Sequence, residues 1–222
     1  NAQLVSLYSK AYLKEKNDLY KSTVVETLNF IKEELTASNG AFYSSLDADS
    51  RNSSGDREEG AYYAWKEQEL NKLLKNDFSL FKDFYNINDF GAWEKNLFVL
   101  IRTQSKIDFA KEHKLTVSVL ENKISNWKKI LKTARNKRSK PNLDDKVLTS
   151  WNALMIQGYV DAYRAIGDKE YLESALKNAT FLMDIQFRDD QGLNRNFKNG
   201  VSTINAYSED YAAVIMSFIS LY

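Results

Sequence analysis

Three polar segments of the chain, residues 40–65, 138–152 and 208–212, place carboxylates beside aromatic residues. Two carboxylates in different environments supply the acid and the base that cleave a glycosidic bond. Aromatic rings stack on sugar faces, while carboxylates and amides bind the hydroxyl groups. The candidate catalytic residues are therefore Asp47, Asp49, Asp144, Asp145 and Asp210. The candidate substrate-binding residues are Glu59, Tyr63, Trp65, Lys146, Trp151 and Asn152.

Structural roles compete with this interpretation in the second segment. Asp144 and Asp145 precede a long helical pattern, so they are equally suited to cap the first N–H groups of that helix. Trp151 stands on the same pattern, where a large apolar ring is typical of the core. The sequence alone leaves both interpretations open.

Other chemistries fit the chain less well. Asp47, Asp49 and Glu58 match part of a calcium-binding loop, but Arg51 takes its fifth position and Asn52 stands where it needs glycine. We therefore expect no metal site and no cofactor. The serines lack a partner for a catalytic triad, because the single histidine lies in a charged helical segment. The absence of cysteine excludes disulfides and thiol nucleophiles in this stretch.

The elements that carry these residues repeat along the chain. Two segments share residue types at a constant separation of 151 residues, and each continues into a polar turn, Asn39–Gly40 or Gln191–Gly192. A constant separation of this kind indicates stacked copies of one supersecondary unit, here a helical hairpin. The matched pairs are Asn1 and Asn152, Ala2 and Ala153, Tyr8 and Tyr159, Ala11 and Ala162, Tyr12 and Tyr163, Tyr20 and Tyr171, and Phe30 and Phe181.

Apolar periodicity and turn residues define the remaining elements. Helices are predicted at 1–16, 18–36, 66–74, 78–84, 105–113, 117–137, 146–166, 168–187 and from 208 to the last residue. Strands are predicted at 41–46, 60–65 and 96–102, the first two forming a ribbon around a polar loop at 47–59, with a second ribbon near 192–204. Asp18 is the predicted N-cap of the second helix, and the basic run 135–140 a solvated helix end.

Composition narrows the class of protein. The 222 residues have a net charge of +1, which disfavours a nucleic-acid partner. The sequence has neither a long apolar run nor a signal pattern, so we expect no membrane association. A cytoplasmic protein that binds a sugar or another small molecule is the expectation.

The last predicted helix has an apolar face that no later segment covers. Val214, Ile215, Phe218 and Ile219 lie on that face. Bare apolar faces usually mark interaction surfaces. We expect this chain to be a fragment of a longer protein, or to form an oligomer through its C-terminal helix.

The same motifs resemble those of a known family. They are Asp47-Ala48-Asp49-Ser50 with Glu59-Gly60 and Tyr63-Ala64-Trp65, then Asp144-Asp145-Lys146 with Ser150-Trp151-Asn152, and Glu209-Asp210-Tyr211-Ala212. They are similar to the YyaL type of thioredoxin-domain-containing proteins, which includes the spermatogenesis-associated thioredoxin-like protein of animals. The resemblance covers nearly all of the chain.

This resemblance implies a thioredoxin-like domain ahead of an (α/α)6 toroid, similar to six-hairpin glycosidases and N-acylglucosamine 2-epimerases. The expected fold is mostly α: residues 1–222 form a single partial (α/α)6-toroid domain with small β-ribbons. The leading hypothesis for function is a carbohydrate-active or carbohydrate-binding toroid, hydrolase-like if catalytic, on fold-level analogy. The epimerases use histidines that this chain lacks, which disfavours epimerisation. The alternative is a non-catalytic module that docks substrates or partners for a thioredoxin-like domain.

Overall fold

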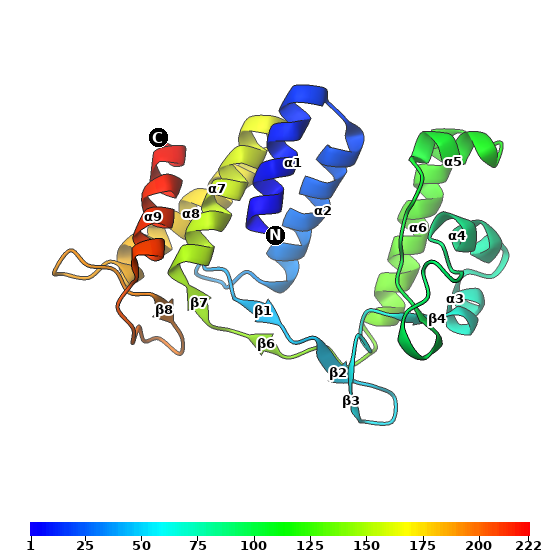
Figure 1. Ribbon diagram of the computed structural model, residues 1–222, viewed down its shortest axis with the longest axis horizontal. Helices are drawn as coiled ribbons and strands as arrows, with labels where there is room; N and C mark the ends of the chain where they lie inside the picture. The colour runs from blue at the N-terminus through cyan, green and yellow to red at the C-terminus, as the bar shows by residue number, and fades with distance from the viewer. The chain divides into compact units, whose positions relative to one another are not determined.

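A computed structural model describes residues 1–222, except for the side chain of Lys95. The chain is mostly helical with small antiparallel sheets, as predicted. It divides into two compact units, which are described one at a time. Unit 1 comprises residues 1–46 and 143–222, and unit 2 comprises residues 47–142 (Figure 1). The single-domain interpretation of the sequence stays a prediction.

Unit 1 holds two helical hairpins, a further helix and short strands. Its helices are α1 (Ala2–Glu15), α2 (Asp18–Glu34), α7 (Thr149–Ile166), α8 (Lys169–Phe181), which continues as the π-helical turn η3 (Leu182–Gln186), and α9 (Ser208–Leu221). Its strands are β1 (Ser45–Leu46), β6 (Leu143–Asp144), β7 (Val147–Leu148) and β8 (Asn196–Phe197). Strand β1 pairs with β6, and β7 pairs with β8, both antiparallel.

Helix α7 is the centre of unit 1, because α1, α8 and α9 all pack against it. Figure 1 shows α1, α7 and α9 in blue, yellow-green and red. Helix α1 approaches α7 closely at Gly158, where a Cβ atom would come within 3.0 Å of the Ala2 carbonyl oxygen. Val5, Leu28, Ile156 and Leu182 are fully buried in the shared core. A helix that is covered on several sides in this way suits the apolar sequence of α7.

The structure reproduces the 151-residue repeat in its backbone geometry. Helix α1 ends at Glu15 and α7 at Ile166, while α2 begins at Asp18 and α8 at Lys169. The caps match as well: the side chains of Asn17 and Asp168 accept hydrogen bonds from the backbone N–H two residues later, at 2.9 and 3.0 Å. Isolated bridges join Thr36 to Phe42 and Phe187 to Leu193 at the same separation.

Equivalent positions of the repeat also meet across the two hairpins. Lys10 of α1 and Asp161 of α7 differ by the repeat length, and their side chains form an ion pair at 3.1 Å. The predicted equivalence of Phe30 and Phe181 is only partly met, because Phe181 is buried whereas Phe30 is half-buried.

Unit 2 is built around a second, aromatic core. Its helices are α3 (Glu67–Leu74), α4 (Phe78–Phe84), α5 (Lys106–Glu112) and α6 (Val117–Arg135), with short 3-10 turns η1 (Lys75–Asp77) and η2 (Glu94–Asn96). Strand β2 (Asp49–Arg51) pairs with β3 (Arg57–Glu59), and β4 (Trp65–Lys66) with β5 (Leu97–Phe98). The ring of Trp127 on α6 lies 5.4 Å from that of Phe81 on α4, edge to face. The Trp127 Nε1 donates to Asp77 at 2.9 Å, so the indole is both buried and hydrogen-bonded.

Strand pairing differs from the sequence prediction. Segments 41–46 and 60–65 do not form a ribbon with each other: β1 pairs with β6, which lies about a hundred residues away, and β4 pairs with β5. The predicted loop 47–59 instead contains the hairpin of β2 and β3. Local alternation can suggest a strand but cannot name a distant partner. The second ribbon is present as isolated bridges, from Asn194 to Asn205 and from Lys198 to Val201.

Two predicted helix ends are also corrected. The N-cap of α2 is Asn17 rather than Asp18, because the Asn17 side chain accepts the hydrogen bond from Leu19. Helix α7 starts at Thr149, since residues 147–148 are taken by strand β7. No helix in the described part of the chain is long and apolar enough to cross a membrane.

Candidate functional site

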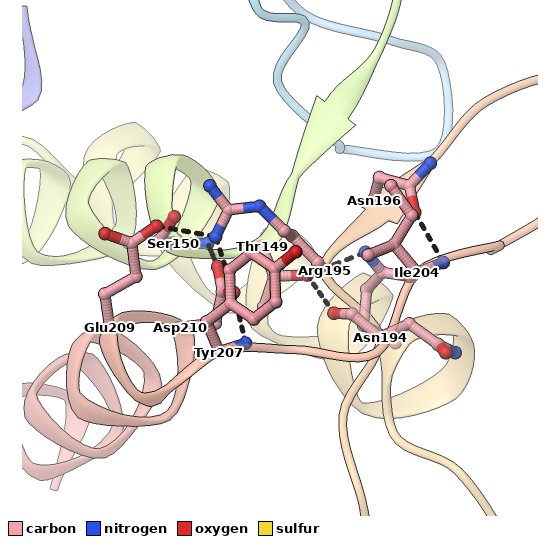
Figure 2. A network of polar contacts seen from close by, with 10 residues as sticks. Thr149, Ser150, Asn194, Arg195, Asn196, Ile204, Tyr207, Glu209 and Asp210 are labelled. Atoms are coloured by element: carbon pink, nitrogen blue, oxygen red, sulfur yellow. Dashed lines mark hydrogen bonds and ion pairs between the residues drawn. The ribbon is translucent and has the colours of Figure 1, made fainter.

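Asp210, a candidate catalytic residue, is the centre of a buried polar network in unit 1 (Figure 2). Its side chain is 0% exposed. Its Oδ1 accepts a hydrogen bond from the Ser150 backbone N–H at 3.1 Å. Its Oδ2 accepts from the Tyr207 backbone N–H at 3.0 Å and from Arg195 Nη1 at 2.9 Å. Both carboxylate oxygens are therefore occupied by protein groups.

These bonds give Asp210 a capping role at two helices. Ser150 lies in the first turn of α7, and Tyr207 immediately precedes α9. The first N–H groups of a helix have no partner within the helix, and the neighbouring Leu148 offers α7 no side-chain cap. The Asp210 carboxylate supplies the missing acceptor, and its negative charge suits the positive end of both helices.

Arg195 completes the network from the segment before β8. Its Nη1 contacts Glu209 Oε1 at 2.5 Å as well as Asp210, and its guanidinium lies 4.7 Å from the centre of the Tyr207 ring. The hydrogen bond to Glu209, with that to Asp210, raises the pKa of Arg195. The Arg195 carbonyl accepts from the Thr149 N–H at 2.9 Å, so this residue caps α7 as well. Figure 2 shows its guanidinium reaching the carboxylates of α9.

Asp144 and Asp145 pair with lysines. Asp144 Oδ2 lies 3.2 Å from Lys146 Nζ, and Asp145 Oδ1 lies 2.6 Å from Lys198 Nζ. The hydrogen bond from Lys198 lowers the pKa of Asp145, because it stabilises the ionised carboxylate. This direction is opposite to the raised pKa that a general acid requires. Asp145 is therefore held in the form of a base or a binding group.

The capping interpretation of these two aspartates is wrong. Strand β7 separates them from the start of α7, and the only backbone N–H that the Asp144 side chain accepts from is that of Lys146, at 3.4 Å, among the recorded hydrogen bonds of the described residues. The capping groups of α7 come instead from Asp210 and Arg195, which are distant in sequence.

Trp151 lines a cavity in unit 1. Its side chain is 52% exposed, so the core interpretation of this residue is wrong. The cavity has a volume of about 360 Å³. Asn1, Gln3, Tyr43 and Ser44 contribute polar atoms to its wall, and none of its 12 lining residues is an aspartate or glutamate. It combines an aromatic platform with amide and hydroxyl groups.

Asn152 is a buried residue of the same cavity wall. Its Oδ1 accepts from the Phe42 N–H at 2.7 Å and from Asn178 Nδ2 at 2.8 Å. Its Nδ2 donates to the carbonyl oxygens of Phe42 at 3.0 Å and Leu148 at 2.9 Å. With four bonds the side-chain amide is fully used. Asn152 therefore positions the Phe42–Ser44 wall of the cavity and has no bonding capacity left for a ligand.

The other candidates lie in unit 2. Asp49 and Glu59 stand directly opposite each other on β2 and β3, and both are exposed. The backbone N–H of Asp47 donates to the Asn142 carbonyl at 2.8 Å. Tyr63 is exposed, but Trp65 is 3% exposed and its ring lies 4.1 Å from the Arg138 guanidinium. Trp65 is thus a core residue of unit 2 rather than an open platform.

The structure accordingly sorts the candidates into two groups. Unit 1 holds Asp144, Asp145, Lys146, Trp151, Asn152 and Asp210, and unit 2 holds Asp47, Asp49, Glu59, Tyr63 and Trp65. The convergence of the two groups on one site stays a prediction. Within the described residues, no group of His, Cys, Asp or Glu could hold a metal ion.

Sequence reasoning missed the partners that complete these arrangements. Arg195, Gln186 and Asn178 are all engaged in hydrogen bonds with the α7 region. Asn178 carried a detectable signal, because it interrupts the apolar stripe of Tyr171, Ala175 and Leu182 on one side of the α8 region. A polar residue on such a stripe needs a buried partner. Arg195 carried no local signal.

Taken together, the fold and the site define unit 1 as two repeated helical hairpins and a further helix, with strand β7 leading into α7. No family model matches the chain. The chain is 31% identical to an uncharacterized protein of Caenorhabditis elegans, over 100% of this chain and 34% of that protein. It is 28% identical to spermatogenesis-associated protein 20 of Homo sapiens and 26% identical to the Mus musculus protein, over 100% of this chain and 32% of each.

These alignments along the whole chain confirm the predicted resemblance: the chain is similar to spermatogenesis-associated protein 20 over its full length. The chain spans about a third of the length of the curated relatives that it matches.

Proposed function

We propose that unit 1 is part of an (α/α)6 toroid that binds a carbohydrate in the cavity beside Trp151. The toroid is supported by the repeated hairpins and by the packing of α1 and α9 against α7. The cysteine-free sequence suits a reducing compartment, so the proposal includes a cytoplasmic location. A thioredoxin-like domain outside this stretch belongs to the same proposal.

The main observation in support of the proposal is the half-exposed indole of Trp151. A tryptophan that is 52% exposed at the wall of a cavity offers an apolar face to a ligand. Sugar rings have apolar faces edged by hydroxyl groups, and pockets for them pair aromatic rings with a few polar groups. Gln3 and Ser44 stand on the same wall as the indole. A small neutral sugar fits this combination better than a charged ligand.

A more specific form of the proposal is that the protein hydrolyses the carbohydrate that it binds. The cavity wall has no carboxylate, so an acid and a base would have to come from neighbouring segments. Asp210 is occupied by three structural hydrogen bonds, and Lys198 keeps Asp145 ionised. Binding therefore has better support than turnover within this chain.

Replacing Trp151 by alanine is expected to weaken sugar binding by roughly 10-fold or more, because the stacking platform is lost. Isothermal titration with a panel of mono- and disaccharides measures this effect. Phe90→Ala is the matched control, since Phe90 is an exposed aromatic residue of unit 2 outside the cavity. Equal loss in both variants, or an unchanged affinity in Trp151→Ala, would refute the assignment of the site.

Docking is the second candidate function, and the surface of α9 favours it. Ile215, Met216 and Ile219 are each more than half exposed on this helix. Such a contiguous apolar face is unusual on a surface that meets only water. We expect Ile215→Glu with Ile219→Glu to reduce self-association or partner binding in light scattering. Leu176→Glu, on an exposed part of α8, should leave the measured mass unchanged.

A further inference from the structure

Unit 2 has a cavity whose wall is rich in cations. Its volume is about 680 Å³, within the range of small-molecule sites. It is a different cavity from that of Trp151, because every residue that lines it belongs to unit 2. The lining residues are Arg51, Asn52, Ser53, Ser54, Glu58, Ala61, Ala64, Lys66, Glu69, Leu97, Lys137, Arg138 and Ser139.

The four cations of this wall come from three different places. Arg51 stands on β2, Lys66 on β4, and Lys137 and Arg138 follow α6. A wall assembled from separate elements surrounds its contents more fully than a single basic helix does. Charged groups that converge from separate segments are typical of binding sites rather than of solvated helix faces.

Of the four cations, Arg138 is already paired with an acidic residue of the wall. Glu69 is held by Arg138, whose Nη2 donates to both of its carboxylate oxygens at 3.0 and 2.9 Å. Lys66 and Lys137 are exposed, and no ion pair is recorded for either one among the described residues. Arg51 donates to the carbonyl oxygen of Gly55, which is uncharged. Positive charge therefore remains available to a ligand.

The sequence around the cavity adds further positive charge. Residues 122–143 carry eight basic side chains and no acidic one. Unit 2 as a whole has 19 basic and 14 acidic residues, although the entire chain is almost neutral. An excess of positive charge around a cavity raises the local concentration of anionic ligands.

Four further wall residues have uncharged side chains that form hydrogen bonds. Ser53, Ser54 and Ser139 present hydroxyl groups, and Asn52 an amide whose Nδ2 donates to Glu58 at 3.1 Å. The cavity is far larger than a single phosphate, so a bare inorganic ion would leave most of it to water. A ligand with a hydroxyl-rich body can bond to the serines while its anionic group meets the lysines.

We propose that this cavity binds a small hydroxyl-bearing molecule with an anionic group of the phosphate or carboxylate type. Lys66 and Lys137 neutralise the anionic group, and the serines contact the hydroxyl groups. The site is independent of the sugar cavity proposed in unit 1.

Titration calorimetry of the whole 222-residue chain at low ionic strength tests this proposal. The probes are glucose 6-phosphate, gluconate, glucose and inorganic phosphate. We expect saturable binding of glucose 6-phosphate that is tighter than that of inorganic phosphate, and weakened by added salt. Gluconate distinguishes a carboxylate from a phosphate preference. Equal affinity for glucose and glucose 6-phosphate, or no saturable binding of any anion, would overturn the proposal.

Variants separate the cavity from general attraction to a basic unit. Lys66→Gln with Lys137→Gln should weaken binding of glucose 6-phosphate by roughly 10-fold or more, because two charge-assisted contacts are lost. Lys111→Gln with Lys129→Gln removes the same charge from exposed sites outside the cavity and should have little effect. Equal losses in the two double variants would contradict a built site. Binding of glucose 6-phosphate that persists in Trp151→Ala does not depend on the proposed sugar cavity, so the two sites are tested separately.

Discussion

Replacing Asp210 by alanine is expected to lower the free energy of unfolding of unit 1 by about 3–5 kcal/mol, the range for breaking a buried ion pair. The change leaves the Ser150 and Tyr207 N–H groups without their acceptor at the ends of α7 and α9. It also deprives Arg195 of its buried partner, although Glu209 remains. Denaturant unfolding followed by circular dichroism gives the measurement.

Two companion variants make this test specific. Asp189→Ala removes an exposed carboxylate and should change the free energy of unfolding by less than about 0.5 kcal/mol. Asp210→Asn keeps the side-chain shape and a carbonyl oxygen, so we expect an intermediate loss. A loss below about 1 kcal/mol in Asp210→Ala would show that the two helix ends are satisfied in another way. In that case Asp210 would remain a candidate catalytic residue.

The hairpin array could be predicted from the sequence because its information is local and repeated. The matched pairs from Tyr8 and Tyr159 to Tyr20 and Tyr171 located both hairpins, and the structure shows matching helix ends and caps. Helix α4 was predicted with its observed bounds, 78–84. Apolar periodicity is reliable where one helix face packs on a core.

The strand pairs could not be predicted in the same way. Each strand has only two or three residues, too few to show an alternation. Strand β1 pairs with β6, and the whole of unit 2 lies between these two strands in the sequence. The segment before β1 is also held by a residue distant in sequence, because Asn152 bonds to both the N–H and the carbonyl of Phe42.

The candidate site likewise could be predicted only in part. Several of the motif residues have structural roles: Asp210 caps helices, Asn152 holds the backbone at Phe42, and Trp65 is buried in a core. Carboxylates and amides serve folding and chemistry with the same hydrogen bonds, so residue type alone does not separate the two. Trp151 differs because it remains exposed beside a cavity.

The basic run 135–140 also differs from its sequence interpretation. Arg138 is not part of a solvated helix end, as the sequence indicated. Its side chain is only 19% exposed. Nη1 donates to the carbonyl oxygens of Ala61, Tyr62 and Ala64 at 3.2, 3.0 and 2.7 Å, and Nη2 binds Glu69. The guanidinium therefore joins the backbone of the Gly60–Trp65 motif to Glu69 of α3.

Arg138→Ala is expected to lower the free energy of unfolding of unit 2 by about 2–4 kcal/mol, because it removes charged hydrogen bonds from three carbonyls and from Glu69. It also removes the guanidinium that lies over the Trp65 ring, so the fluorescence of Trp65 should change in the folded state. Denaturant unfolding, followed by near-UV circular dichroism and tryptophan fluorescence, measures both effects.

The comparison of Arg138→Lys with Lys129→Ala distinguishes two roles of Arg138. Either its hydrogen bonds stabilise unit 2, or only its positive charge does. Lysine keeps the charge at position 138 but cannot form the planar fork that reaches Glu69 and the carbonyls together. If its hydrogen bonds stabilise unit 2, Arg138→Lys should lose more than half of the stability that Arg138→Ala loses, while Lys129→Ala, at an exposed site of α6, stays within about 0.5 kcal/mol of the parent chain. Full recovery of stability in Arg138→Lys would instead show that only the positive charge at the end of α6 matters.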